Sequence, residues 1–322
     1  MRGRALLPLA LLAAAAPVPE PPRLTFPLAC ALGKDCAIQS YQDDDPGPGV
    51  RDYRCGGRTY AGHGGTDIRL TSMAQQRRGV NVLAAAPGVV RGIRDGEPEM
   101  SMRRRPAGDI AGKECGNGVV IAHPGGWQTQ YCHMARGSIA VRPGQAVATG
   151  AVLGRVGLSG DTEFPHLHLS VRHDGDTVDP FAWGAAAGQC RGGRSLWANT
   201  PAYAEGHVLV AGFAAGPVTM DAVQEEGAGQ VPPPRRDTPL VAFAQAIGLQ
   251  GGDAQRMVLR APDGQVLADN RAPPLDRDKA QVILFAGKKA PAGGWPAGTY
   301  RSEYQVIRSG RVAIERRDAI TL

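Results

Sequence analysis

Residues 119–134 have the sequence VVIAHPGGWQTQYCHM, in which two apolar runs flank a turn. The runs at residues 119–122 and 128–134 have the composition of strands, and the histidine, proline and glycines between them are typical of a tight turn. We therefore predict an antiparallel hairpin. Closing it brings Cys115, just before the first strand, close to Cys132 in the second, so we expect a disulfide between them at the base of the hairpin.

Similar short runs continue on both sides of this hairpin. They lie at residues 80–86, 89–93, 151–156 and 166–171, and they alternate with glycine and proline. The chain has 44 glycines and 26 prolines but only 5% aromatic residues, a balance that favours strands and turns over long helices. We predict an all-β protein whose first part is an antiparallel sheet.

The composition also limits the class of protein. Apolar residues make up 43% of the 322 residues and charged residues 20%, which excludes a disordered chain and a polytopic membrane protein. The net charge is +6, and the basic residues are scattered along the chain rather than gathered in a stripe. We therefore expect no nucleic-acid partner. The length suggests two domains.

We divide the chain into four segments. Residues 1–16 contain Arg2 and Arg4 before an apolar stretch that ends in small residues, which is the pattern of a secretory signal peptide cleaved after Ala16. We expect a first domain at 17–184 with an N-terminal cysteine-containing extension, a linker at 185–205 and an accessory domain at 206–322. The last has strand-like runs at 208–213, 240–246, 257–261, 280–285, 299–307 and 312–322, which predict an immunoglobulin- or fibronectin-like β-sandwich.

The signal peptide and the cysteines indicate the compartment. The apolar stretch is shorter than the ~20 residues that span a bilayer, and no later segment qualifies, so we expect no membrane span. Six cysteines, all before residue 191, predict up to three disulfides in an oxidising space. The connectivity beyond Cys115 and Cys132 stays open.

Three short motifs in the first domain contain the residue types that bind metals. The first is His63-Gly64-Gly65-Thr66-Asp67, whose glycines disfavour a helix, so we expect both potential ligands to lie on one loop. The second is His133, at the end of the second hairpin strand. In the third, His166 and His168 alternate on a predicted strand and therefore share a face at a separation of ~6.5 Å.

In this order, within one all-β segment of an exported chain, the motifs resemble those of the lysostaphin-type zinc metallopeptidases, a family of peptidoglycan endopeptidases. The resemblance covers about residues 60–183. It implies that His63, Asp67 and His168 bind one Zn²⁺ per chain and that His133 and His166 are the catalytic pair, with the general base left open between them. Two imidazoles and one carboxylate leave a coordination position for water, which zinc can activate to attack an amide.

The resemblance leads us to expect a secreted endopeptidase that cleaves peptide crosslinks of peptidoglycan. Its partners would be peptidoglycan peptide stems in the periplasm of a Gram-negative cell. One alternative is a non-catalytic relative that binds in the same groove and activates a cell-wall amidase, which the presence of all five residues argues against. Another is a zinc protease of secreted proteins. The scissile bond, the partner of the C-terminal domain and the oligomeric state stay open.

Overall fold

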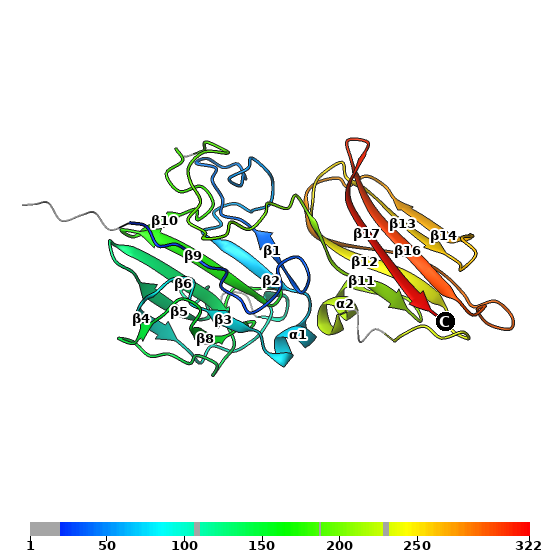
Figure 1. Ribbon diagram of the computed structural model, residues 1–322, viewed down its shortest axis with the longest axis horizontal. Coiled ribbons are helices and arrows are strands. Elements are labelled where there is room, and N and C mark those ends of the chain that lie inside the picture. The colour runs from blue at the N-terminus through cyan, green and yellow to red at the C-terminus, as the bar shows by residue number, and fades with distance from the viewer. Residues whose placement is uncertain (1–19, 106–109, 187, 228–231) are drawn as a thin grey trace, which may run out of the picture.

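The computed structural model describes residues 20–105, 110–186, 188–227 and 232–322, and it is nearly all β, as predicted. Two β-rich bodies lie side by side along the long axis of the molecule (Figure 1). Every pair of strands within its sheets is antiparallel. None of the helices in these residues is long and apolar enough to cross a membrane. The expected signal peptide at 1–16 lies outside the described residues.

The first body is built on an eight-stranded sheet with the order β1-β2-β9-β6-β5-β4-β7, in which β10 also pairs with β9. Its strands are β1 (Cys36–Ser40), β2 (Thr66–Leu70), β4 (Gly88–Arg94), β5 (Asn117–Ala122), β6 (Trp127–Met134), β7 (Ala146–Val147), β9 (His166–His173) and β10 (Asp176–Val178). A second, two-stranded sheet consists of β3 (Asn81–Leu83) and β8 (Val152–Arg155). The short helices are α1 (Met73–Arg78) and η1 (Met102–Arg104).

The predicted hairpin is present as β5 and β6, which pair antiparallel across the turn at 123–127. Its disulfide is also confirmed, because Cys115 is bonded to Cys132. Trp127 and Tyr131 of β6 are buried in the core of the first body, together with Ile121 of β5. The hairpin therefore forms the centre of the sheet, and β9 adds to its free edge along β6.

The second body contains two sheets, with the orders β11-β12-β15 and β14-β13-β16-β17. Their strands are β11 (His207–Ala214), β12 (Leu240–Leu249), β13 (Ala254–Arg260), β14 (Val266–Ala272), β15 (Lys279–Lys288), β16 (Thr299–Arg308) and β17 (Arg311–Thr321). Apolar side chains of both sheets share one core, which includes Ala244 of β12, Leu259 of β13 and Tyr304 of β16. An immunoglobulin- or fibronectin-like topology stays a prediction.

Residues 185–205, predicted to be a linker, form no helix or strand in their described part but pack against the first body. Cys190 is bonded to Cys55, and the side chains of Leu196 and Trp197 are buried in the first core. The segment runs beside the loops that follow β1, above the sheet in Figure 1. The third disulfide joins Cys30 to Cys36, so that among the described residues no cysteine is free.

The two bodies meet through β1 and the sheet β11-β12-β15. Ala37 of β1 packs in one apolar cluster with residues of that sheet, among them Leu209 and Phe243. The Gln39 amide donates a hydrogen bond to the Ala280 carbonyl over 3.0 Å. Helix α2 (Met220–Glu226) of the second body also lies against α1, as Figure 1 shows. The second body is thus attached close to β2, which carries part of the candidate site.

Asp179 is a buried carboxyl group in the first body. Its Oδ1 accepts a hydrogen bond from the Phe181 amide over 2.7 Å, whereas its Oδ2 is buried without a hydrogen-bond partner among the described residues. Burial, with a smaller contribution from the nearby carboxylates of Asp44 and Asp52, raises the pKa of Asp179 to about 7 from an ordinary value of 3.8. The fold therefore favours the neutral form of this side chain.

We predict that Asp179→Asn makes the protein more stable at pH 8 but changes its stability little near pH 4. Because the folded pKa is raised, the contribution of Asp179 to the free energy of unfolding is fully present below its ordinary pKa. This contribution is lost as the pH rises toward 7, at about 1.4 kcal/mol per pH unit. Urea unfolding at both pH values measures this difference. The exposed Asp176→Asn is the control, and an identical pH dependence for Asp179→Asn and the natural chain would contradict the prediction.

Candidate active site

Three side chains of the first body place one potential ligand atom each at a common point. His63 Nε2 lies 3.1 Å from Asp67 Oδ1 and 3.1 Å from His168 Nδ1, and His168 Nδ1 lies 2.8 Å from Asp67 Oδ1. Antiparallel pairing of β2 with β9 sets Asp67 directly opposite His168. The three atoms are close enough to contact a single ion, and two imidazoles with one carboxylate are a donor set that suits zinc.

His63 lies on a loop, as predicted, but Asp67 does not. The expectation that one loop carries both residues is wrong, because Thr66–Leu70 forms the fully buried strand β2. The loop part of the motif is His63 with the glycines at positions 64 and 65, and Gly65 has no room for a side chain next to His168. The structure thus holds Asp67 through backbone pairing and leaves His63 to approach from the loop.

Hydrogen bonds to the far side of each ring fix the orientation of the two histidines. His63 Nδ1 donates to the Tyr41 carbonyl over 2.6 Å, which leaves Nε2 as the nitrogen with a free lone pair. Ser170 Oγ donates to the Gly64 carbonyl over 2.9 Å, so it accepts from His168 Nε2 over 3.0 Å. The lone pair of His168 is then on Nδ1, which is the atom that faces Asp67.

His133 reaches the same place through an unusual backbone conformation. Cys132 pairs with His168 and shares its face, so strand alternation alone would turn His133 to the opposite face. His133 instead has a φ of 62°, in the left-handed region, and its ring centroid lies 4.5 Å from that of His166. Its amide donates to the Cys115 carbonyl over 2.8 Å, beside the disulfide, which holds the turned backbone in place.

The rings of His133 and His166 are also anchored through Nδ1. His133 Nδ1 donates to the Ser159 carbonyl over 2.8 Å, and His166 Nδ1 lies 3.0 Å from the Phe164 carbonyl and 3.0 Å from Thr162 Oγ1. In both rings Nε2 is the nitrogen that remains available. His166 Nε2 lies 3.5 Å from Asp67 Oδ1, so this nitrogen is directed toward the three potential ligands.

Burial controls the charge at this site. Burial would raise the pKa of Asp67, but His63 and His166 hold it well below its usual value. Burial lowers the pKa of His63, but Asp67 outweighs this effect, and the net pKa is raised. Burial also lowers the pKa of His168, and it holds the pKa of His133 well below the ordinary range. The carboxylate is therefore ionised in a crowded set of imidazoles and can balance added positive charge.

Several of these side chains line a surface hollow with a volume of about 350 Å³, which we call the groove. Its lining includes His63, His133 and His168, together with Tyr60, Glu114, Gln130, Asp161, Ser170 and Arg172. The ring of Tyr60 stacks on that of His63 with centroids 4.3 Å apart. The Cys115–Cys132 disulfide forms part of the wall next to His133.

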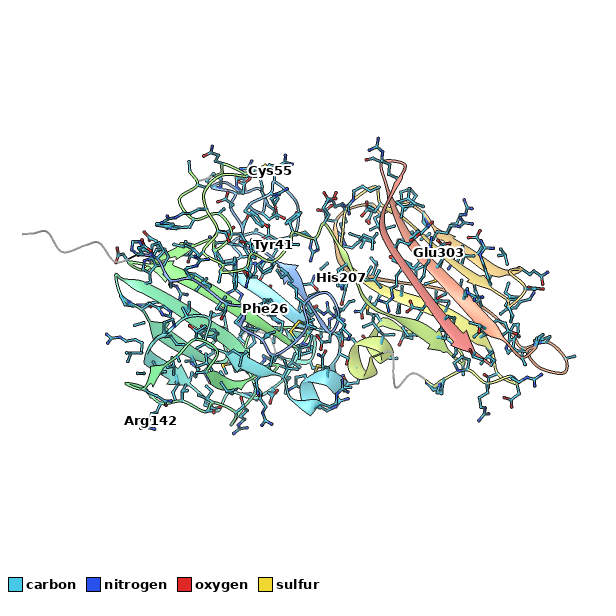
Figure 2. The ribbon with its side chains drawn as sticks, viewed as in Figure 1. Phe26, Tyr41, Cys55, Arg142, His207 and Glu303 are labelled. Carbon is cyan, nitrogen blue, oxygen red and sulfur yellow. A yellow bond between two sulfur atoms is a disulfide. The ribbon has the colours of Figure 1, made fainter. Side chains whose placement is uncertain are left out.

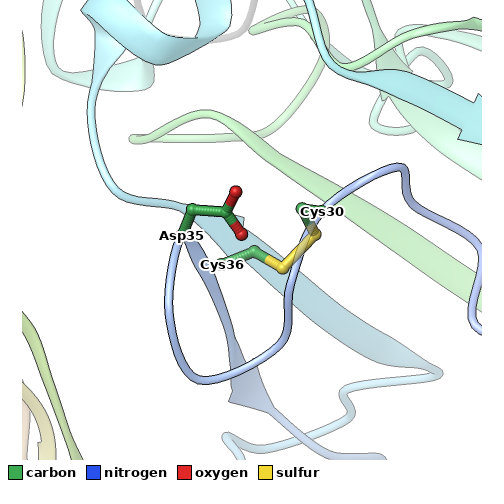
Figure 3. A group of neighbouring side chains, drawn as sticks. All are labelled: Cys30, Asp35 and Cys36. Atoms are coloured by element: carbon green, nitrogen blue, oxygen red, sulfur yellow. A yellow bond between two sulfur atoms is a disulfide. The ribbon is translucent and has the colours of Figure 1, made fainter.

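A second cluster of potential ligands does not form a comparable site. Cys30, Asp35 and Cys36 lie together, but the two sulfurs are bonded to each other (Figure 3). The Asp35 carboxylate accepts a hydrogen bond from the Ala31 amide over 2.6 Å. This group therefore closes a short loop before β1.

The sequence prediction named the five residues that the structure brings together, but it missed the groups that orient them. Ser170 could have been found, because it continues the alternation of His166 and His168 on the same face. The Tyr41 and Ser159 carbonyls had no sequence signal, since any residue supplies a backbone carbonyl. Tyr41 lies in the first body just after β1, as Figure 2 shows, and the fold brings its carbonyl to the His63 ring from 22 residues away in the sequence.

Arg69 links this site to the second body. It lies opposite His166 in the pairing of β2 with β9, and its side chain is buried with its guanidinium 4.0 Å from the Phe164 ring centroid. It donates to Gln39 Oε1 over 3.0 Å and to Gln281 Oε1 of β15 over 2.8 Å. Burial lowers the pKa of Arg69 to about 9, so it still carries its charge at neutral pH.

This segment of the first body is similar to known peptidases. Residues 61–180 match the model of peptidase family M23. The cell division protein DipM of Caulobacter vibrioides is 31% identical over 99 residues, which are 31% of this chain and 15% of that protein. The match thus spans less than a sixth of the length of that relative.

Two solved structures are also similar. A zinc-containing peptidase from Vibrio cholerae is 25% identical, with a TM-score of 0.30 and coverage of 44% of this chain and 35% of the other. The catalytic domain of lysostaphin from Staphylococcus simulans is 18% identical, with a TM-score of 0.28 and coverage of 44% and 85%.

The first body is therefore an antiparallel sheet that presents two histidines and an aspartate to one point, with two further histidines beside them, an arrangement that suits a metal site. The match to peptidase family M23 over residues 61–180 confirms the resemblance to the lysostaphin-type peptidases that the motifs indicated.

We predict that Gln281→Leu lowers the free energy of unfolding by about 1–3 kcal/mol, because the buried Arg69 guanidinium loses an acceptor. Adding Arg69→Met to this variant should cost less than it does in the natural chain, since the unpaired charge is then removed. Urea unfolding of the single and double variants measures the coupling. Exposed Gln265→Leu serves as the control, and additive effects of Gln281→Leu and Arg69→Met would contradict the predicted link.

Proposed function

We propose that this protein is a secreted, zinc-dependent endopeptidase that cleaves peptide crosslinks of bacterial peptidoglycan. The observation that carries the proposal is the convergence of His63 Nε2, Asp67 Oδ1 and His168 Nδ1 within hydrogen-bond distance of one another, beside the rings of His133 and His166. Membership of a peptidase family supports the reaction class. The relation to a cell division protein supports the cell wall as the place of action.

In this proposal His63, Asp67 and His168 hold one Zn²⁺. The site-facing nitrogens of the two histidines are lone-pair donors because Tyr41 and Ser170 occupy the other ring nitrogens. A zinc ion bound there would supply a Lewis acid that activates water for attack on an amide carbonyl.

His133 and His166 act next to these ligands as the catalytic pair. Each keeps Nδ1 on a backbone carbonyl and presents Nε2, which can accept a proton from the attacking water or, once protonated, donate a hydrogen bond to the developing oxyanion and a proton to the leaving amine. We assign these roles to the two histidines jointly.

Three disulfides support an oxidising compartment for this reaction. We propose the periplasm of a Gram-negative cell, where crosslinks join D-alanine to a diamino acid. The second body is an accessory domain in this proposal, and the groove accepts an extended peptide between the sheet and the loops.

We predict that Asp67→Ala and His168→Ala each lose zinc, because each removes a ligand. His133→Ala and His166→Ala should retain zinc but lower turnover about 100-fold or more, the usual effect of removing a proton-transfer or oxyanion group. Elemental analysis and rate measurements on the purified chain separate the two groups.

The matched control is His173→Ala, on the same strand as His168 but facing away from the groove. This variant should change neither the zinc content nor the turnover. Circular dichroism checks that each variant is folded. Full zinc content in Asp67→Ala and His168→Ala, or zinc loss in His133→Ala and His166→Ala, would overturn the assignment of roles.

We predict that the purified protein converts crosslinked muropeptide dimers to monomers, that a chelator abolishes this conversion, and that added zinc restores it. Chromatography of digested peptidoglycan is the measurement. Release of stem peptides from the sugar in the presence of an amidase, with dimers intact, would favour an amidase activator. Cleavage of an unfolded protein but not of muropeptides would favour a protease of secreted proteins.

A further inference from the structure

The face of β9 that carries the candidate site continues beyond the histidines to an arginine. His166, His168, Ser170 and Arg172 alternate along the strand and therefore share one face, and the last three line the groove. His166 and His168 belong to the proposed chemistry, and Ser170 orients His168. Arg172 has no part in the proposed metal site or the catalytic pair, although it is a half-buried cation in the same groove.

One hydrogen bond directs the Arg172 side chain toward the site. Its guanidinium donates to Gln130 Oε1. Across the pairing of β6 with β9, Gln130 lies opposite Ser170, whereas Arg172 itself lies opposite Gln128. The guanidinium therefore leans along the groove toward His168 rather than away from it.

Gln130 is itself fixed by the disulfide in the groove wall. Its amide nitrogen lies 3.2 Å from Cys115 Sγ and 3.3 Å from Cys132 Sγ, which sets the amide so that Oε1 faces Arg172. The arginine is thus held in one orientation before any ligand binds. A group held in this way loses little conformational freedom on binding.

The described residues give Arg172 no carboxylate partner. Two acids line the groove, Glu114 and Asp161, but neither forms an ion pair with Arg172. The Glu114 carboxylate instead accepts a hydrogen bond from the Gly112 amide over 2.9 Å. A guanidinium has five N–H donors in a planar fork that matches a carboxylate, and Gln130 engages only one of its nitrogens.

We infer that Arg172 binds a free carboxylate of the crosslinked peptide and so selects the substrate of the groove. This inference rests on the proposed function. A crosslink between D-alanine and a diamino dicarboxylic acid offers two sources of that group. One is the carboxylate on the carbon that bears the scissile amide nitrogen, and the other is the carboxylate at the end of a stem peptide.

The test compares three synthetic crosslinked dimers: one with both carboxylates free, one amidated on the diamino acid and one amidated at the stem end. For the natural chain, amidating the carboxylate that Arg172 binds should lower kcat/KM by about 10-fold or more, mainly through KM, because a charge-assisted hydrogen bond is lost. The dimer that shows the loss identifies the source of the carboxylate.

Arg172→Gln should cleave the free and amidated dimers equally, and Arg172→Lys should keep part of the preference because it keeps the charge but not the planar fork. The control is Arg142→Gln, at an exposed position labelled near the lower edge of the first body in Figure 2, and it should keep the full preference. A purely structural role for Arg172 would lower the rates on all three dimers by the same factor in Arg172→Gln, and that result would overturn the inference.

A binding measurement separates this inference from the proposed function. Calorimetry with uncrosslinked stem peptides, free and amidated, should show weaker binding of the amidated peptide to the natural chain and no difference for Arg172→Gln. If no dimer is cleaved by the natural chain, the proposed function is wrong, and the calorimetry still decides the role of Arg172. Equal dissociation constants for free and amidated peptides with the natural chain would overturn the inference that Arg172 binds the carboxylate.

Discussion

The antiparallel register of β2, β9 and β6 is the constraint on which the candidate site depends. It sets Asp67 opposite His168 and His168 opposite Cys132, so three neighbouring strands direct side chains to one face. A slip of one residue would move His168 to the core face and Leu167 or Leu169 to the groove. Because these leucines are fully buried, the apolar core opposes any such slip and thereby maintains the polar geometry on the other face.

The same register couples the site to the second body. Arg69 lies opposite His166, packs on Phe164 and reaches Gln281 on β15. A buried guanidinium without an acceptor is costly, so this bond favours the arrangement in which β15 lies against β1 and β2. The second body therefore contributes to the surroundings of the candidate site rather than only extending the chain.

The sequence predicted the strand that carries His166 and His168 because apolar and polar residues alternate there. It did not predict β2, since Asp67 and Arg69 interrupt the apolar pattern of a strand that is buried on both faces. The left-handed conformation of His133 had no signal either, because it results from contacts with Cys115 that exist only in the fold. The Cys115–Cys132 bond followed from a local hairpin, whereas Cys55 and Cys190, 135 residues apart, require knowledge of the whole fold.

The four histidines of the candidate site differ in which ring nitrogen the protein occupies, yet each of them keeps one nitrogen free on the side of the site. His63, His133 and His166 have Nδ1 against backbone carbonyls, whereas His168 has Nε2 against Ser170. A carbonyl can only accept a hydrogen bond, so it fixes the proton on the nitrogen that faces away from the groove. The site-facing nitrogen of every ring is then a lone-pair donor. These nitrogens differ in their distance from Asp67 Oδ1: His63 Nε2 and His168 Nδ1 lie at 3.1 and 2.8 Å, whereas His166 Nε2 lies farther away at 3.5 Å. The distances support the proposed division into metal ligands and catalytic groups, which the residue type alone would not give.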